Sequence, residues 1–284
     1  EISLGLVGSE MCIRDRSTFW VQYEMTYDDF HKDAERIYLV RMDDCHFGGH
    51  YSDFVPYALG NHLKTTYTEI EDFCASGQNT LFIKNGKQIT EYPMLMPDTT
   101  FIRMMDIKVL EGDNQFFLST SPEKSGIAIT EKAAQDLFGT TRVIGETITD
   151  NNHRHEYRIS AIVSDWGEHS NFKYAFMGRT NNDTSWDNAN YRMLIKIKSG
   201  TNVDVLLEKM NQHFPDELKK NSYGVTGYTR FYLEPITSLR YADEFIRGDE
   251  QIVRFRYIVY FSITGVLILS LIHISEPTRP RLIS

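Results

Sequence analysis

The sequence predicts an α+β fold in which two β-α-β halves flank an inserted α+β subdomain. A strand–helix–strand pattern occurs twice, over residues 37–75 and 191–236, and the residues between the two copies read as several short strands and two short helices. Paired halves of this kind commonly share one mixed sheet with helices on one face. We therefore expect the strands around Ile37 and Ile195 to lie in the same sheet.

The first half follows an aromatic segment, residues 17–23, that resembles the end of a membrane span. Asp28 precedes apolar residues at helical spacing, and we expect it to cap a short helix with Phe30, Ala34 and Ile37 on one face. Residues 37–42 then alternate as a strand.

The second helix of this half begins near Pro56, which suits a first helical turn. His62 lies on its apolar face, where a packing role is far more common than metal binding. A strand resumes over residues 70–75. The residues at helical spacing are Ala58, Leu59, His62, Leu63 and Tyr67.

The inserted region starts with a hairpin, residues 81–92, whose turn is Asn85-Gly86. A short helix capped by Asp98 follows and leads into a strand. A strand then enters a helix that Thr130 caps and Gly139 ends. A second hairpin, over residues 143–166, completes this region.

The second half repeats the first. Residues 190–200 form a strand, Asn202 caps a helix, and Pro215 ends it. Residues 229–236 give the last strand. The apolar stripe of the helix comprises Val203, Leu206, Leu207, Met210 and Phe214.

The two ends of the chain share an unusual relation. Residues 6–15 and 269–279 can be encoded by complementary strands of one DNA segment, and both resemble translated transposon-type sequencing adapters. An inverted repeat native to the gene is the alternative. We expect residues 1–16 and 269–284 to be non-native and leave them out of fold reasoning.

An uncharged apolar run, residues 257–268, precedes the C-terminal segment. A membrane helix needs about 20 apolar residues, so this run fits either the start of a truncated span or a buried core helix. The charged residues before it, with Tyr257 and Tyr260 at the boundary, favour the membrane span.

Composition limits the possible partners. The formal net charge of −9 argues against a general nucleic-acid binder. Cys12 lies in the N-terminal segment, which leaves Cys45 and Cys74; spacing alone does not decide whether they pair, and unpaired thiols are the simpler reading.

No catalytic, cofactor-binding or metal-binding residue is predicted. Residues 139–147, "GTTRVIGET", differ from a phosphate loop in spacing, and Glu146 replaces the required lysine, so a helix stop is the better reading. His153 and His155 could bind a metal, but they lie at an expected hairpin tip where polar residues are usual. The acidic pairs at residues 28–29 and 43–44 read as capping or loop residues.

The residues "YEMTYDDFHKDAERIYLV", 23–40, resemble the segment after the first membrane helix in MacB/FtsX-type ABC-transporter permeases. Leu39 departs from that pattern, where a basic residue is usual. Three later stretches resemble the family in the same order: "TTFIRMMDIKVLEGD", "GIAITEKAAQDLFG" with "VIGETI", and "YRISAIVSDWGEHSNFKYAF", which lacks a proline usual near Trp166.

The resemblance implies a MacB-like periplasmic core domain, with a porter-like subdomain of two β-α-β halves and an inserted Sabre-like subdomain between membrane helices one and two. The corresponding divisions are a non-native segment 1–16, a membrane-proximal segment 17–36, the first porter half 37–80, the inserted subdomain 81–187, the second porter half 188–240, a stalk with the start of helix two 241–268, and a non-native segment 269–284.

The function implied is mechanical. The resemblance predicts a non-catalytic permease subunit of the inner membrane, with most of this chain in the periplasm, that couples ATP hydrolysis by a separate cytoplasmic ATPase to extracytoplasmic movement. It implies a second permease subunit and allows a periplasmic or outer-membrane partner. It implies no cofactor and no nucleic acid, and it does not select a substrate. The alternative is the extracytoplasmic sensor domain of a membrane receptor.

Overall fold

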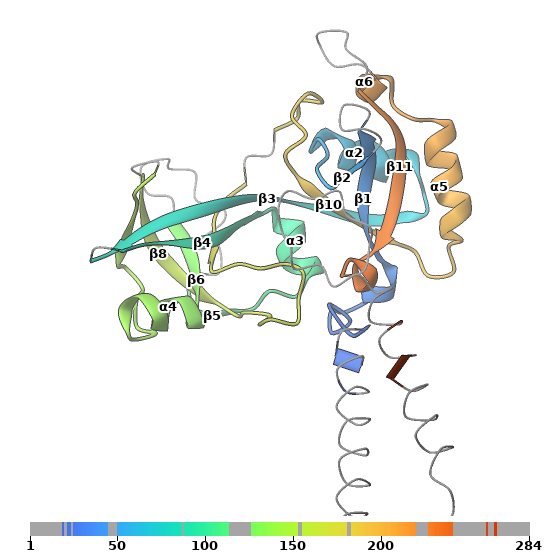
Figure 1. Ribbon diagram of the computed structural model, residues 1–284. Coiled ribbons are helices and arrows are strands. Elements are labelled where there is room, and N and C mark those ends of the chain that lie inside the picture. Colours follow the sequence, from blue (N-terminus) through green and yellow to red (C-terminus); the bar gives the residue numbers. More distant parts are fainter. Residues whose placement is uncertain are drawn as a thin grey trace, which may run out of the picture.

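A single mixed sheet extends through the molecule (Figure 1). The computed structural model describes residues 19, 22–23, 25–44, 50–86, 88–113, 126–152, 155–180, 183–219, 227–240, 260 and 264–265. The strand order is β11-β1-β10-β3-β4-β9-β6-β8-β5, with β2 paired to β1 and β7 paired to β3 and β8.

The two β-α-β halves interlock at one end of this sheet. β1 and β3 belong to the first half, and β10 lies between them; β10 and β11 belong to the second half, and β1 lies between them, so neighbours are antiparallel. This is the split β-α-β arrangement of ferredoxin-like folds. Tyr38 is paired with Ile195, which confirms that the strands around Ile37 and Ile195 share a sheet.

The elements of this part are the 3-10 helix η1 (Ala34–Arg36), β1 (Ile37–Asp44), β2 (His50–Ser52), α2 (Ala58–Thr66), β3 (Ile70–Asn85), β10 (Arg192–Ile197), α5 (Val203–Gln212), α6 (Asp216–Lys219), β11 (Tyr228–Pro235) and the 3-10 helix η5 (Ile236–Ser238).

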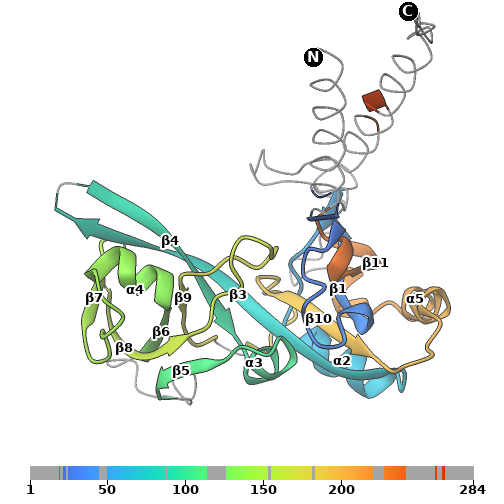
Figure 2. The same ribbon diagram turned by 90° about the horizontal axis from the view of Figure 1, so that it is seen from below.

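The inserted region builds the other end of the sheet, and the long β3–β4 hairpin reaches across it (Figure 2). Its elements are β4 (Gln88–Pro97), α3 (Thr99–Met104), β5 (Val109–Gly112), β6 (Gly126–Thr130), α4 (Glu131–Phe138), β7 (Thr147–Asp150), β8 (His155–Val163) and β9 (Phe176–Met177).

β3 differs from the prediction. The sequence predicts one strand over residues 70–75 and a separate hairpin that starts at residue 81. Residues 70–85 instead form one strand, since β4 pairs with β3 from Ser76 to Asn85. β3 therefore belongs to both ends of the sheet, and the boundary at residues 80/81 that the sequence suggests falls inside it.

Buried apolar residues occupy both faces of the sheet. Met193 and Ile195 of β10 face the core beneath α2 and α5, whereas Leu194 between them faces the opposite core. This burial on both faces explains the nearly unbroken apolar sequence of β10. A third core fills the inserted region; its fully buried members are Leu81, Ile127, Ile129, Ala134, Ile159 and Phe176.

Three predicted helix caps are confirmed. The side chains of Asp98, Thr130 and Asn202 each accept a hydrogen bond from a backbone N–H three residues later. Gly139 ends α4 at φ 69°, a left-handed conformation that glycine adopts without steric cost. The predicted hairpin turn at Asn85-Gly86 also joins β3 and β4.

The prediction that Asp28 caps a helix is wrong. Residues 26–33 form turns, and the helical residues that follow are confined to η1. Asp28 has φ 57°, which is incompatible with a standard N-cap, and Phe30 is 49% exposed whereas Ala34 and Ile37 are buried. The Asp28 side chain instead makes long-range contacts.

The predicted terminal segments 1–16 and 269–284 lie outside the described residues, as does nearly all of residues 241–268. Among the residues that the structure describes, none of the helices combines the length and the apolar character that a membrane crossing requires.

Gly60 provides a test of the packing beneath α2. A Cβ atom at this position would lie 2.2 Å from two ring carbons of Phe73. In a free helix Gly→Ala stabilises by up to about 1 kcal/mol, but here we expect Gly60→Ala to lower the free energy of unfolding by about 1–3 kcal/mol through overpacking. Chemical denaturation measures the change. Asn61→Ala, at an exposed position of the same helix, is the control, and a stabilised Gly60→Ala variant would contradict the packing.

Candidate functional site

The turn after the aromatic segment docks on a distant loop. We call this contact the joint: residues 23–33 on one side and the loop of residues 164–172 on the other. Tyr27, Asp28 and His31 are buried in it, although they precede the first strand.

The carboxylate of Asp28 is the centre of the joint. It accepts hydrogen bonds from the Ser170 hydroxyl, from the backbone N–H of Asn171 at 3.0 Å, and from the Asn171 side-chain amide at 2.7 Å. His31 Nε2 lies 3.6 Å from Asp28 Oδ1. A buried carboxylate is costly unless it is hydrogen-bonded or paired, so these donors explain how the charge is tolerated. Aspartate is also among the residues that best tolerate the positive φ found here.

An aromatic stack brings a third segment to the joint. The Tyr27 ring stacks on His169, with centroids 4.5 Å apart, and the guanidinium carbon of Arg240 lies 4.5 Å from the centre of the Tyr27 ring. Thr26 Oγ1 is 3.0 Å from His169 Nε2. Because Arg240 follows η5, the joint contacts the chain both before β1 and after β11.

Trp166 links the joint to the core. Its ring meets that of His31 edge to face at 4.6 Å and also contacts Phe172 and Tyr174. It also borders a cleft of about 250 Å³ beside α4. The loop of residues 164–172, which binds Asp28, is therefore packed against the core on one side and lines the cleft on another.

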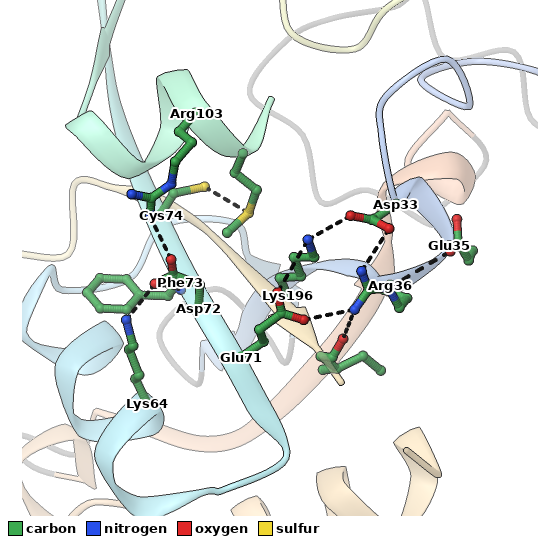
Figure 3. Close-up of polar contacts among 12 residues, drawn as sticks. Asp33, Glu35, Arg36, Lys64, Glu71, Asp72, Phe73, Cys74, Arg103 and Lys196 are labelled. Atoms are coloured by element: carbon green, nitrogen blue, oxygen red, sulfur yellow. Dashed lines mark hydrogen bonds and ion pairs between the residues drawn. The ribbon is translucent and has the colours of Figure 1, made fainter. Parts of the chain in front are cut away.

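An ion-pair network fixes the end of this segment to the sheet (Figure 3). Asp33 contacts Arg36 and Lys196, each at 2.7 Å, and Glu71 contacts the same two cations at 2.8 and 3.5 Å. Hydrogen bonds from Arg36 and Lys196 lower the pKa of Asp33 to about 2. The network joins η1 to β10 and β3 and includes Asp33, the last residue of the joint.

Asp98 forms a second buried polar centre. Its carboxylate accepts hydrogen bonds from the backbone N–H of Phe101 and of Ala75, and the Tyr57 hydroxyl lies 3.4 Å away. Burial raises its pKa to about 6 despite these bonds. Asp98 thereby attaches α3 to β3.

Cys74 is a buried free thiol whose sulfur lies 3.5 Å from that of Met104 (Figure 3). Burial raises the pKa of this thiol well above its usual value, which makes it unreactive. Cys45 lies outside the described residues, so the predicted lack of pairing between the two stays a prediction.

The residues considered as sites in the sequence lie at the ends of helices and strands where the structure describes them. Gly139 and Gly145 end a helix and precede a strand, and His155 begins β8 after a hairpin turn; His153 lies outside the described residues. Within the described part of the chain, no three His, Cys, Asp or Glu residues cluster so that they could hold a metal ion. The joint was not predicted as a unit, although the family-like pattern includes Tyr27, Asp28 and His31.

Comparison with known proteins gives a family match. The family model described as MacB-like periplasmic core domain matches residues 18–213. None of the curated proteins matches the chain significantly.

Three solved structures are similar. A domain of a putative permease protein from Porphyromonas gingivalis is 16% identical, with a TM-score of 0.56 over 72% of this chain and 91% of that one, which shows a shared fold. The periplasmic region of MacB from Actinobacillus actinomycetemcomitans is 12% identical (TM-score 0.49; 75% and 94% covered). The extracellular domain of the noncanonic ABC-type transporter YknZ from Gram-positive bacteria is 14% identical (TM-score 0.48; 68% and 98% covered).

Asp28→Asn tests the joint. Asparagine tolerates the positive φ but replaces one acceptor oxygen with a donor that faces the donors of Ser170 and Asn171. We expect the free energy of unfolding to fall by about 1–3 kcal/mol and amide exchange in residues 25–33 to accelerate. Exposed Asp29→Asn is the matched control. Equal effects of the two substitutions would show that the buried contact contributes nothing.

Asp98 gives a pH dependence with a defined sign. Its folded-state pKa of about 6 exceeds its ordinary value, so its contribution to stability is fully present below pH 3.8 and is lost as the pH rises through 6. Relative to Asp98→Asn, the natural chain should therefore gain up to about 3 kcal/mol as the pH falls from 7 to 4. Denaturation of both proteins at several pH values measures this difference. If the stability of the natural chain relative to Asp98→Asn stays constant or falls on acidification, burial does not raise the pKa of Asp98.

Proposed function

The chain belongs to the MacB-like periplasmic core domain family, and from this premise we propose that it couples ATP hydrolysis on a separate ATPase subunit to movement outside the membrane. The family is one of periplasmic domains of ABC-transporter permeases. We place this chain at the inner membrane, with residues 37–240 in the periplasm and residues 241–268 leading into a second span.

The joint is the observation that carries this proposal. A displacement of residues 23–33 acts directly on the loop of residues 164–172, because Asp28 is hydrogen-bonded to Ser170 and Asn171. Arg240, which follows the last strand of the domain in sequence, contacts the same stack. Movement of either chain segment that leads away from the sheet therefore reaches the inserted region.

The rest of the fold is suited to carrying a displacement over a distance. β3 runs through both ends of the sheet, and the Asp33–Arg36–Lys196–Glu71 network ties it to η1. A body of this kind needs no reactive side chain, so we propose that the subunit is non-catalytic. We also propose a porter-like role for residues 37–80 and 188–240 and a Sabre-like role for residues 81–187.

The partners follow from the same proposal. An ATPase on a separate chain supplies the energy, and a second permease subunit completes the transporter; a periplasmic or outer-membrane protein is a third partner. The family match favours this function over that of a receptor sensor domain, because the matched family is one of transporter permeases.

The proposal is tested in the intact permease assembled with its ATPase in membranes. Spin labels at Gln135→Cys in α4 and Val205→Cys in α5, both exposed positions, report the distance between the two ends of the sheet. Buried Cys74 is shielded from the label, and Cys45→Ser together with replacement of any cysteine in the rest of the intact permease removes the other thiols from labelling. We expect the distance distribution to change when ATP is added.

Asp28→Asn should reduce that ATP-dependent change while ATPase activity persists, and Asp29→Asn should leave it intact. A distance that is insensitive to ATP in the natural protein would overturn the proposed coupling. A change that survives in Asp28→Asn would remove the joint from the path.

A further inference from the structure

A row of polar side chains crosses the sheet where β10 begins. Arg192 is the register partner of Ser76 on β3, and Arg41 on β1 follows Val40, the partner of Met193. Register partners project from the same face of a sheet. Arg41, Arg192 and Ser76 therefore lie on one face, in a sheet that is otherwise apolar at its centre.

Arg192 is poorly satisfied in this row. Asp53 Oδ1 lies 2.7 Å from Arg41 Nε, whereas Asp53 Oδ2 lies 3.4 Å from an Nη atom of Arg192. Arg192 Nε is buried without a hydrogen-bond partner among the described residues. One carboxylate is thus shared between two guanidinium groups, with the weaker contact to Arg192.

Ser76, opposite Arg192, also has an unpaired side-chain atom among the described residues. Its side chain is fully buried, and its Oγ has no hydrogen-bond partner in the described structure. Buried polar groups of this kind are rare because an unpaired one loses the hydrogen bonds that it would make with water. Arg192 Nε and Ser76 Oγ are two such groups on paired positions of adjacent strands, which indicates that one bound group contacts both.

Solvent reaches the row at Arg192. The Arg192 side chain is 25% exposed, whereas the Arg41 side chain is 5% exposed and Ser76 is fully buried. The guanidinium carbon of Arg192 lies 5.9 Å from the centre of the Phe54 ring, a contact that restricts its orientation.

We propose that Arg192 and Ser76, beside the Arg41–Asp53 ion pair, form an anion site that binds a carboxylate or an inorganic oxyanion. The guanidinium fork matches both classes, and the Ser76 hydroxyl supplies a further donor. The site lies in the part of the fold formed by the two β-α-β halves and is separate from the joint. It does not depend on the proposed function.

The test is thermal unfolding of the full chain in increasing sodium sulfate, sodium phosphate or sodium acetate, with sodium chloride added to hold the ionic strength constant. We expect the melting temperature of the natural chain to rise saturably. Arg192→Gln should weaken the apparent affinity at least tenfold, and Ser76→Ala about threefold. Arg103→Gln, which removes an exposed arginine paired with Asp72, is the matched control.

The probes separate the sources of the anion. Saturation with acetate alone assigns a carboxylate, saturation with sulfate and phosphate alone assigns a tetrahedral oxyanion, and saturation with all three assigns the shared chemistry. A response without saturation, or one that is equal in Arg192→Gln and Arg103→Gln, reflects general salt effects and overturns the site. If Arg192→Gln does not fold, an unchanged affinity in Ser76→Ala overturns it.

Discussion

The continuous pairing of β3 constrains the whole molecule. The first residues of this strand are bonded to β10, and its later residues are bonded to β4 and touch β7. The two ends of the sheet are therefore connected through backbone hydrogen bonds along one strand, and a change in the distance between them has to bend or twist β3. The joint adds a second connection, because Asp28 holds the inserted region from a position before β1. The inserted region is therefore attached to the rest of the fold at two separate points.

Local chemistry in the sequence predicts the elements well. Asp98, Thr130 and Asn202 were identified as caps because a cap needs only a side-chain oxygen and a backbone N–H three residues later. The turn at Asn85-Gly86 is equally local. The β-α-β halves could also be paired correctly, since their apolar stripes leave one face for the sheet and one for the helices.

The misses share a physical cause. Asp28 before apolar residues satisfies the pattern of a helix cap, but its acceptor oxygens are taken by Ser170 and Asn171, which lie far along the chain. Residues 76–80 lie outside the predicted strands because extended structure there depends on β4 as a partner. The joint was visible in the sequence only as the family-like pattern around Asp28; nothing local identifies its partner loop. The same holds for Arg192 and Ser76, which are brought together by strand register.

Asp33 and Asp98 contribute to the stability of the fold with opposite dependence on pH. Asp33, whose pKa is lowered by Arg36 and Lys196, stabilises the fold above its ordinary pKa and loses that contribution as the pH falls toward 2. Asp98, whose pKa is raised by burial, contributes stability that is lost as the pH rises through about 6. From these two groups alone, the contribution of Asp33 is fully present above pH 3.8, and the contribution of Asp98 declines as the pH rises from 3.8 through about 6. Above that range Asp98 is ionised and the cost of burying its charge lowers the stability of the fold, whereas the network around Asp33 keeps its full contribution. At neutral pH Asp33 is therefore ionised in the network that fixes η1 to β10 and β3, whereas the buried charge of Asp98 lowers the stability of the fold.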